Sequence, residues 1–367
     1  MKSALIRGLV AHADKHAAAA KPAVITLVFI IAPDSAYDAN YCPWRRRTVK
    51  PLDAFAPPFA LGRQPAIQSP MNYRHAFHAG NFADVLKHAV IASCLEHLKK
   101  KAKPFRVIDT HAGIGLYDLT AHPARRSPEF RDGIARVLEA DRPAPVDAAL
   151  APLLDVVNGL NTAEGLAAYP GSPEIAARLA REGDRIHLCE LHAEDARVLD
   201  QRYARDARIK AEPRDGYAAL KSLVPPREKR GLVLVDPPFE DRDELAHMAE
   251  AVMPAIERWP TGLYVFWRPL KDLWAAERFD VGLAEWLISE QGLDPEKILR
   301  ADLWVRDLES EGKLAGAGVV VVNPPYTLED QLLALLPWLA DALAQGDGAG
   351  WRLDGAIGED TLMVDEF

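Results

Sequence analysis

Residues 105–115 read FRVIDTHAGIG and carry the strongest indication of the fold class. Its first five residues, of which Phe105, Val107 and Ile108 are apolar, predict a short buried β-strand. Gly113 and Gly115 follow the strand directly, and a residue without a Cβ lets the backbone approach a ligand closely. The pattern D-x-x-x-G-x-G is short enough to occur by chance, so its meaning depends on the segments around it.

Strands and helices alternate on both sides of this stretch. The predicted strands are 186–190, a short segment near Ile209, 231–235, 263–267 and 319–322. The predicted helices include an amphipathic one at 83–98, one at 174–182 and one at 192–204. This alternation predicts an α/β fold with a mostly parallel sheet and right-handed crossovers. Residues 116–169 are interrupted by prolines and predict an inserted helical segment.

Composition limits the class of protein. The chain has 367 residues, 49% hydrophobic and 26% charged, which is the balance of a soluble globular protein. Its cysteines, Cys42, Cys94 and Cys189, have no C-x-x-C spacing. The sequence therefore predicts neither a structural zinc site nor a disulfide framework, and a reducing cytoplasm suits it best.

The charge is unevenly distributed. Residues 1–70 hold nine Lys or Arg against four Asp or Glu, so the remaining chain is more acidic than the net charge of -9 suggests. A protein that coats nucleic acid is normally basic. If this chain acts on RNA or DNA, it must therefore contact it through a local patch. The Lys99–Lys103 run and the Arg227, Lys229 and Arg230 cluster are typical of solvated surface beside strand beginnings.

The first 70 residues differ from the rest. They contain eight of the 28 prolines and no sustained periodicity, which predicts a disordered or spurious N-terminal extension, with Met71 as the true start. The apolar run Ala23–Ala32 is too short for a membrane helix, which needs about 20 residues. We therefore expect no membrane partner and a single domain over 71–367.

Four acidic residues stand at the ends of predicted strands: Asp109, Glu190, Asp215 and Asp236. In open α/β sheets, ligands bind outside the carboxyl ends of the strands. Glu190 ends the second strand and suits the two hydroxyls of an adenosyl ribose. The helical segment accounts for its separation from Asp109. We expect these carboxylates to converge on one site.

The most specific motif is Asp236-Pro237-Pro238-Phe239, which follows a strand. A carboxylate and the Pro237 carbonyl can accept both N–H bonds of an exocyclic amine, and Phe239 can stack on the base. This arrangement suits methylation of an amino nitrogen. Asn323-Pro324-Pro325-Tyr326 fits the same pattern, but it follows the last predicted strand. We expect that strand to be antiparallel, which would place Asn323 at the opposite edge.

Several blocks together resemble the RlmJ family. They are MNYRHAFHAGNFADVLKH at 71–88, then DTHAGIG, YPGSP, CELH, DG and DPPFE, and the resemblance covers residues 71–351. The family implies a Rossmann-like class I methyltransferase fold with an inserted helical subdomain at about 116–169. It also implies transfer of a methyl group from S-adenosylmethionine to adenine N6 in 23S ribosomal RNA, at position 2030. The enzyme is expected to be cytoplasmic and monomeric.

The resemblance also implies site residues. Donor-binding positions would be His88, His111, Ser172, Glu190, Asp215, Gly216 and Asp236. Asp236 would be the catalytic residue, and Tyr73, Pro237 and Phe239 would contact the substrate. Two features depart from the family: Phe239 stands where Tyr is also common, and the 70-residue leader has no counterpart and would crowd Tyr73.

Several of these residues also have an ordinary structural interpretation. Ser172 is explained as a helix N-cap, Asp215-Gly216 as a turn, and His88 and Tyr73 as packing residues. His75 and His78 lack a carboxylate–histidine constellation at ligand spacing, so we expect no metal.

Three other functions compete with the proposed one. A DNA adenine-N6 methyltransferase would use the D-P-P-F motif in the same way, but the sequence has no evident target-recognition domain. A binding module that lost its chemistry would not need the intact motif. A nicotinamide oxidoreductase is disfavoured because the third glycine of its fingerprint is missing.

Overall fold

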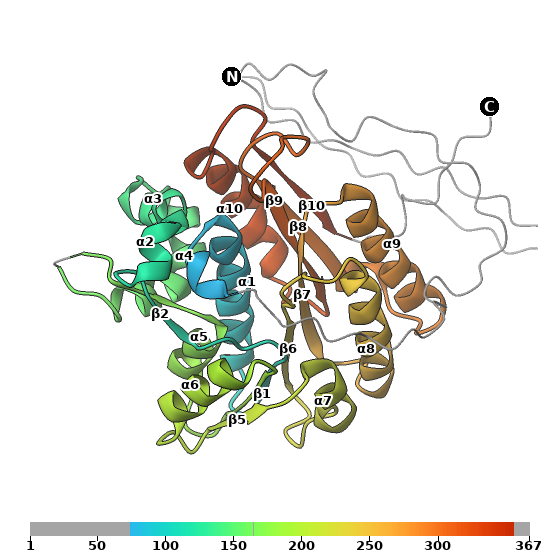
Figure 1. The fold of residues 1–367 in the computed structure, drawn as a ribbon. Helices are drawn as coiled ribbons and strands as arrows, with labels where there is room; N and C mark the ends of the chain where they lie inside the picture. The colour runs from blue at the N-terminus through green and yellow to red at the C-terminus, as the bar shows by residue number, and fades with distance from the viewer. Residues whose placement is uncertain (1–73, 164, 356–367) are drawn as a thin grey trace, which may run out of the picture. The chain divides into compact units, whose positions relative to one another are not determined.

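The computed structural model describes residues 74–163 and 165–355 (Figure 1). The expectations for residues 1–70 and for Tyr73 therefore lie outside the described residues. No helix within them is long and apolar enough to span a membrane.

The described residues form an eight-stranded main sheet in the order β10-β8-β9-β7-β6-β1-β4-β5. Its strands are β1 (Arg106–Asp109), β4 (Arg185–Glu190), β5 (Ile209–Pro213), β6 (Gly231–Val235), β7 (Leu263–Pro269), β8 (Ile298–Trp304), β9 (Gly316–Val322) and β10 (Gly350–Gly355). β1, β4, β5, β6 and β7 are parallel, whereas β9, β8 and β10 add antiparallel pairs. The predicted mostly parallel α/β sheet is confirmed.

Helices cover both faces of the sheet. One face carries α1 (Phe82–Lys99), α4 (Ala144–Asn158), α5 (Ser172–Leu179), α6 (Ala193–Tyr203) and α10 (Leu328–Ala342). The other carries α7 (Gly216–Leu223), α8 (Glu244–Arg258) and α9 (Leu273–Ser289). Figure 1 shows α1, α4 and α10 on one side of the strands and α8 and α9 on the other. Each layer buries its own apolar core.

The strand order contains a topological switch point. From β1 the chain moves outward to β4 and β5, then returns to β6 and β7 on the other side of β1. The crossovers diverge there, and a crevice opens at the carboxyl ends of the strands. This connectivity places the ends of β1, β4 and β6 side by side.

The predicted helical segment is present between β1 and α5. It comprises β2 (Leu116–Asp118), α2 (His122–Arg126), η2 (Glu129–Asp132), α3 (Ile134–Glu139), α4 and β3 (Ala168–Pro170). β2 and β3 pair in an antiparallel two-stranded sheet. Sequence analysis missed this sheet because each strand is only three residues long and shows no usable period.

Two strands of the main sheet, β8 and β10, were also missed, so the strand before Asn323 is not the last one. All seven residues of β8 are buried, including Arg300 and Asp302. These charged residues interrupt the apolar pattern that would identify a buried strand. Their partners, Asp280 and Arg268, come from other elements, and no local pattern could reveal them.

The helix predicted at 83–98 is α1, but it is not amphipathic. Fifteen of its 18 residues are buried, because α4, α5, α10 and the sheet enclose it. It begins at Phe82 because the Asn81 side chain accepts a hydrogen bond from the Asp84 backbone, 3.0 Å away. The buried residues include Asp84, Lys87 and His88, which therefore need internal partners.

Candidate active site

A pocket of 1210 Å³ lies at the carboxyl edge of the sheet, bounded by the ends of β1, β4, β6 and β7, the start of α1 and the helical insertion. The predicted site residues that line it are His111, Ser172, Glu190, Asp215, Gly216, Asp236, Pro237 and Phe239. The structure therefore brings together eight residues that are up to 128 positions apart in the sequence.

The glycine loop after β1 depends on glycine at its turns. Gly113 and Gly115 have φ values of +62° and +83°, a region that disfavours other residues. A Cβ on Gly113 would also lie 2.5 Å from the Tyr117 hydroxyl oxygen. Glu190 fixes the loop by accepting the Gly113 backbone N–H at 2.8 Å.

Glu190 retains capacity for a ligand. Its Oε1 accepts the His192 backbone N–H at 2.7 Å, and its Oε2 accepts that of Gly113. Burial raises the pKa of this carboxyl, and the two backbone hydrogen bonds oppose the rise. A carboxylate offers about four lone-pair directions, so two remain for hydroxyl donors. The contact of Glu190 with a ribose stays a prediction.

Ser172 is not the N-cap that sequence analysis predicted. The cap is Gly171, and Ser172 is the first residue of α5. Its hydroxyl instead donates to Asp109 Oδ2 at 2.6 Å. Burial raises the pKa of Asp109 to about 7, although the Ser172 hydrogen bond favours the ionised form. Ser172 binds Asp109 instead of capping α5 because Asp109, at the end of β1, lies next to the first residue of α5.

The hydrogen bonds of Thr110 define the tautomer of His111. The Thr110 hydroxyl donates to the Leu234 carbonyl at 2.9 Å and lies 2.8 Å from His111 Nδ1. Since the hydroxyl proton is used, its oxygen accepts from Nδ1–H, and Nε2 is left as an acceptor. Burial lowers the pKa of His111 to about 4, so the ring is neutral at pH 7. It packs edge-on against Tyr217.

Asp215 and Gly216 open α7 and are more than a turn. Asp215 Oδ1 accepts the backbone N–H groups of Tyr217 and Ala218 at 2.9 and 3.2 Å, which caps the helix and leaves Oδ2 for a ligand. A Cβ on Gly216 would lie 2.0 Å from the Thr110 carbonyl oxygen. Only glycine therefore lets α7 begin this close to the loop after β1.

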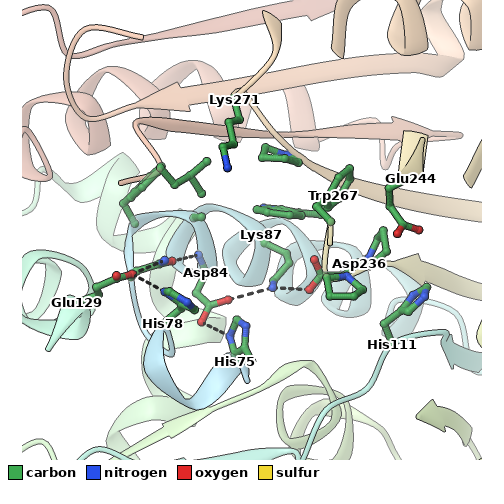
Figure 2. A pocket seen from close by; sticks show the side chains of 18 of the residues that line it. His75, His78, Asp84, Lys87, His111, Glu129, Asp236, Glu244, Trp267 and Lys271 are labelled. Atoms are coloured by element: carbon green, nitrogen blue, oxygen red, sulfur yellow. Dashed lines mark hydrogen bonds and ion pairs between the residues drawn. The ribbon is translucent and has the colours of Figure 1, made fainter. Parts of the chain in front are cut away.

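Asp236 is tied to α1 by an ion pair that sequence analysis did not identify. Lys87 Nζ donates to Asp236 Oδ2 at 2.5 Å and lies 2.9 Å from Asp84 Oδ1. His75 Nε2 lies 2.8 Å from the other Asp84 oxygen. Figure 2 shows these side chains as a continuous chain from His75 to Asp236. The only signal in the sequence is the i,i+3 spacing of Asp84 and Lys87 inside a predicted helix.

Lys87 and Asp84 both remain charged at neutral pH. Burial alone would lower the pKa of Lys87, but Asp236 and Asp84 raise it well above its usual value. Burial would likewise raise the pKa of Asp84, and the neighbouring His75 and Lys87 hold it well below its usual range. Lys87 is only 4% exposed, so its ammonium depends on these two carboxylates.

Two aromatic rings line the pocket next to Asp236. Phe239 lies at a φ of +51° and packs edge-on against Trp267, with ring centroids 5.5 Å apart. Trp267 also has the Lys87 ammonium 5.7 Å from its ring centroid. Sequence analysis predicted Phe239 but not Trp267, although Trp267 ends a predicted strand. A planar ligand beside Asp236 would meet both residues.

His88 is the predicted donor-binding residue that does not line the pocket. It is 1% exposed, and its Nδ1 lies 2.9 Å from the Tyr169 hydroxyl. Burial lowers its pKa to about 3, so the ring is neutral. His88 therefore lies one layer behind the pocket wall, in contact with Tyr169 and 3.8 Å from Asp84.

The second motif lies outside the pocket. β9 is antiparallel to both of its neighbours, so Asn323 is at the opposite edge of the sheet, as predicted. Its side-chain amide donates to the backbone carbonyls of Pro260 and Gly262 at 2.8 and 2.7 Å. With its amide donors committed to the backbone, Asn323 serves the fold and not the pocket.

His75 and His78 both have carboxylate neighbours. His75 contacts Asp84, and His78 Nδ1 lies 3.1 Å from Glu129 Oε2. Within 74–163 and 165–355, no three His, Cys, Asp or Glu residues are grouped so that they could hold a metal ion.

Comparisons with known proteins show the family of the chain. The family model described as ribosomal RNA large subunit methyltransferase D, RlmJ, matches residues 102–356. Ribosomal RNA large subunit methyltransferase J of Escherichia coli strain K12 is 38% identical over 74% of this chain and 94% of its own length. The protein of that name from Haemophilus influenzae Rd is 36% identical over 77% of this chain and 98% of its own length.

A solved structure shares the fold. A crystal structure of a Legionella pneumophila protein, assigned to the family DUF519, is 31% identical, with a TM-score of 0.68 over 76% of this chain and 98% of that one. Fold and site thus define a Rossmann-like class I methyltransferase. The chain belongs to the RlmJ family of ribosomal RNA large subunit methyltransferases.

Proposed function

We propose that this enzyme transfers the methyl group of S-adenosylmethionine to N6 of an adenine in 23S ribosomal RNA, at position 2030, as the family resemblance implies. The observation that carries the proposal is the Asp236 carboxylate. Lys87 occupies its Oδ2, which leaves Oδ1 and the Pro237 carbonyl to receive an amine inside the pocket.

The donor occupies the part of the pocket beneath the glycine loop. Glu190 accepts its ribose hydroxyls, and Asp215, Gly216, His111 and Ser172 line the rest. His88 supports this wall from behind through Tyr169. Among the residues that the structure describes, ten Asp or Glu, three Lys and no Arg line the pocket. This excess of negative charge favours the cationic sulfonium of the donor.

The acceptor adenine enters beside Phe239 after leaving its stack, at a cost of a few kcal/mol. Its amine donates one N–H to Asp236 Oδ1 and the other to the Pro237 carbonyl, which directs the nitrogen lone pair at the methyl carbon. The C–N bond forms as the C–S bond breaks, and the methylated nitrogen, now positively charged, releases one N–H proton to solvent water. Phe239 and Trp267 restrict the base plane. Tyr73 would contact the RNA.

The same chemistry could act on DNA. The D-P-P-F motif does not discriminate between an adenine in DNA and one in RNA, and family membership favours RNA. We propose a monomeric, cytoplasmic enzyme that needs no metal ion, as the resemblance implies.

A competition experiment tests the substrate. The full chain is incubated with methyl-labelled S-adenosylmethionine, protein-free 23S RNA from a strain without the enzyme, and an equal mass of adenine-containing duplex DNA. Mass spectrometry of the nucleosides should find N6-methyladenosine in the RNA alone. Label in the DNA would support the alternative, and label on another ribonucleoside would contradict the proposed chemistry.

A further inference from the structure

The pocket is poorly suited to the phosphates of an RNA substrate. Its lining is dominated by carboxylates, and Lys87, one of its three lysines, is buried and paired. RNA affinity comes largely from contacts between cationic side chains and phosphates. A large RNA must therefore find cations elsewhere on the protein.

Such cations are grouped at the opposite edge of the sheet, where α1 ends. We use the name Tyr326 surface for Lys100, Lys101, Lys103, Arg230 and Tyr326. The three lysines are exposed and follow the last turn of α1. Their loop is fixed, because Arg230 donates to the carbonyls of Leu98 and Lys103 at 2.9 and 2.5 Å. The lysine side chains thus extend from an ordered backbone.

Tyr326 belongs to the second motif, which the active site does not use. Its side chain is 79% exposed, the largest value among the exposed large hydrophobic residues of the described chain. The Lys100 ammonium lies 5.3 Å from its ring centroid, and the His97 ring packs edge-on at 5.5 Å. The Asn323 amide holds the turn before it against the start of β7. An aromatic face is therefore held in solvent beside an ammonium group.

The electrostatics show that these cations form one cluster. The pKa of His97 is lowered, first by burial and then by repulsion from Lys100, Lys101 and Arg230. The pKa of Arg230 is also lowered by burial, with a contribution from Arg181. The nearby Glu96 is already paired with Lys99 at 2.5 Å. The positive charge is therefore available to an external anion.

We propose that the Tyr326 surface binds the ribosomal RNA substrate at nucleotides remote from the target adenine. One base stacks on Tyr326, and the flanking phosphates pair with Lys100, Lys101 and Lys103. Lys87 and Lys100 are separated by 13 residues of helix, or about 20 Å. The contact thus supplies affinity and register without touching the reacting base. This inference rests on the proposed function.

The chemistry favours RNA over an acidic protein. Carboxylates of a peptide could pair with the lysines, but they would leave the exposed Tyr326 face without a planar partner. Every nucleotide offers both a base and a phosphate, and this combination is typical of single-stranded nucleic acid sites.

The test measures binding of a radiolabelled 23S RNA transcript to the full chain across a series of KCl concentrations. Tyr326→Leu should weaken binding at least fivefold, since stacking contributes about 1–3 kcal/mol per base. The double variant Lys100→Gln/Lys101→Gln should weaken it and reduce the slope of log K against log salt by about 2. Tyr326→Phe keeps the ring and should bind as the wild type, as should Lys221→Gln on α7.

Catalysis separates this inference from the proposed function. At saturating RNA, both variants should keep the wild-type kcat, while KM rises with the dissociation constant, and S-adenosylmethionine should bind unchanged. Unaltered RNA affinity in both variants would overturn the inference. So would a defect seen only with assembling particles, which would assign the surface to a protein partner. A wild-type enzyme that does not methylate the transcript would instead contradict the proposed function.

Discussion

At the scale of single residues, the orientation of the Asp236 carboxylate is set by which of its two oxygens already has a partner. Lys87 binds Oδ2 from α1, and in our proposal this leaves Oδ1 for the substrate amine. An isolated carboxylate on a loop could rotate and offer either oxygen. The ion pair removes that freedom before the adenine arrives, and a misplacement of 1 Å in such a group can reduce a rate about 100-fold.

Lys87→Met should therefore reduce kcat by about 100-fold while S-adenosylmethionine still binds. The variant keeps the volume of the stem but removes the ammonium. It should also be less stable by about 3–5 kcal/mol, because one partner of a buried ion pair is lost. Single-turnover methyl transfer and denaturant unfolding measure the two effects.

The control for Lys87→Met is Lys99→Met, which removes an ammonium from the last turn of the same helix. Within the described part of the chain the Lys99 ammonium pairs with Glu96 alone, far from Asp236, so kcat should not change. A wild-type kcat in Lys87→Met would show that Asp236 does not need its anchor.

Gly216→Ala should weaken donor binding. The new Cβ would lie 2.0 Å from the Thr110 carbonyl oxygen, so α7 must move away from the glycine loop. Overpacking of this kind costs about 1–3 kcal/mol. Calorimetric titration with S-adenosylmethionine should show a rise of at least fivefold in the dissociation constant.

Gly183→Ala is the matched control, because no atom lies within 4 Å of the position of its Cβ. It should bind the donor as the wild type does. Equal affinities for Gly216→Ala and Gly183→Ala would contradict the close approach of α7 to β1.

At the scale of elements, α1 couples the pocket to the core, and its buried His88 should make stability depend on pH. The folded pKa of His88 is about 3, and an exposed histidine titrates near 6.5. The unfolded chain therefore binds one more proton between these values, and stability is lost as the pH falls from about 6.5 towards 3. For this one group the loss at pH 5 is about 2 kcal/mol.

His88→Gln should remove that loss. Denaturant unfolding of the wild type and the variant is compared at pH 7.5 and pH 5.0. At pH 7.5 the free energy of unfolding of the variant should be lower than that of the wild type, because the packing on Tyr169 changes. Between pH 7.5 and pH 5.0, however, it should fall by about 2 kcal/mol less than that of the wild type. Parallel losses in both proteins would mean that His88 is protonated in the native state.

Also at the scale of elements, a buried ion network joins β7 and β8 to α9, next to β9. Arg268 pairs with Asp302 at 2.9 Å and donates to Asp280 at 2.6 Å, and all three are at most 1% exposed. A Cβ on Gly318 of β9 would lie 1.9 Å from Asp302 Oδ1. The glycine thus makes room for a buried ion network behind the end of β7, where Trp267 lies.

Gly318→Ala should destabilise the protein by about 3 kcal/mol or more, because it breaks a buried ion pair. Thermal unfolding measures the change. Gly282→Ala in the middle of α9, where the Cβ position is open, should stabilise it by about 0.5–1 kcal/mol. Equal melting temperatures for the two variants would contradict the network.

The elements show what the sequence could predict. The parallel strands ending at Asp109, Glu190 and Val235 were predicted because each is a short, mostly apolar segment before a polar residue or turn. β8 was missed because its charges find partners in other elements. Ser172 was taken for a cap because its bond to Asp109 spans 63 residues, a distance that local patterns cannot reveal.

At the scale of the whole molecule, the same reasoning explains the candidate site. The carboxylates could be assigned because parallel topology brings the ends of β1, β4 and β6 together. Lys87 and Trp267 were missed because their roles depend on how α1 and β7 pack around the pocket. In a sequence, a lysine on a helix and an aromatic residue on a strand are both ordinary.

The two edges of the main sheet differ in charge. The carboxyl edge holds the acidic pocket, and the opposite edge holds the exposed lysines after α1. This separation explains how a chain with a net charge of -9 can act on RNA. A cationic donor is attracted to one edge and a polyanion to the other.

The most direct test of the central claim is single-turnover methyl transfer by Asp236→Ala and Asp241→Ala, with donor affinity measured in parallel. Asp241 is exposed and lies five residues further along the same loop. We expect both variants to bind S-adenosylmethionine, Asp241→Ala to transfer the methyl group at the wild-type rate, and Asp236→Ala to transfer it at least about 100-fold more slowly. Near-wild-type transfer by Asp236→Ala would contradict the account.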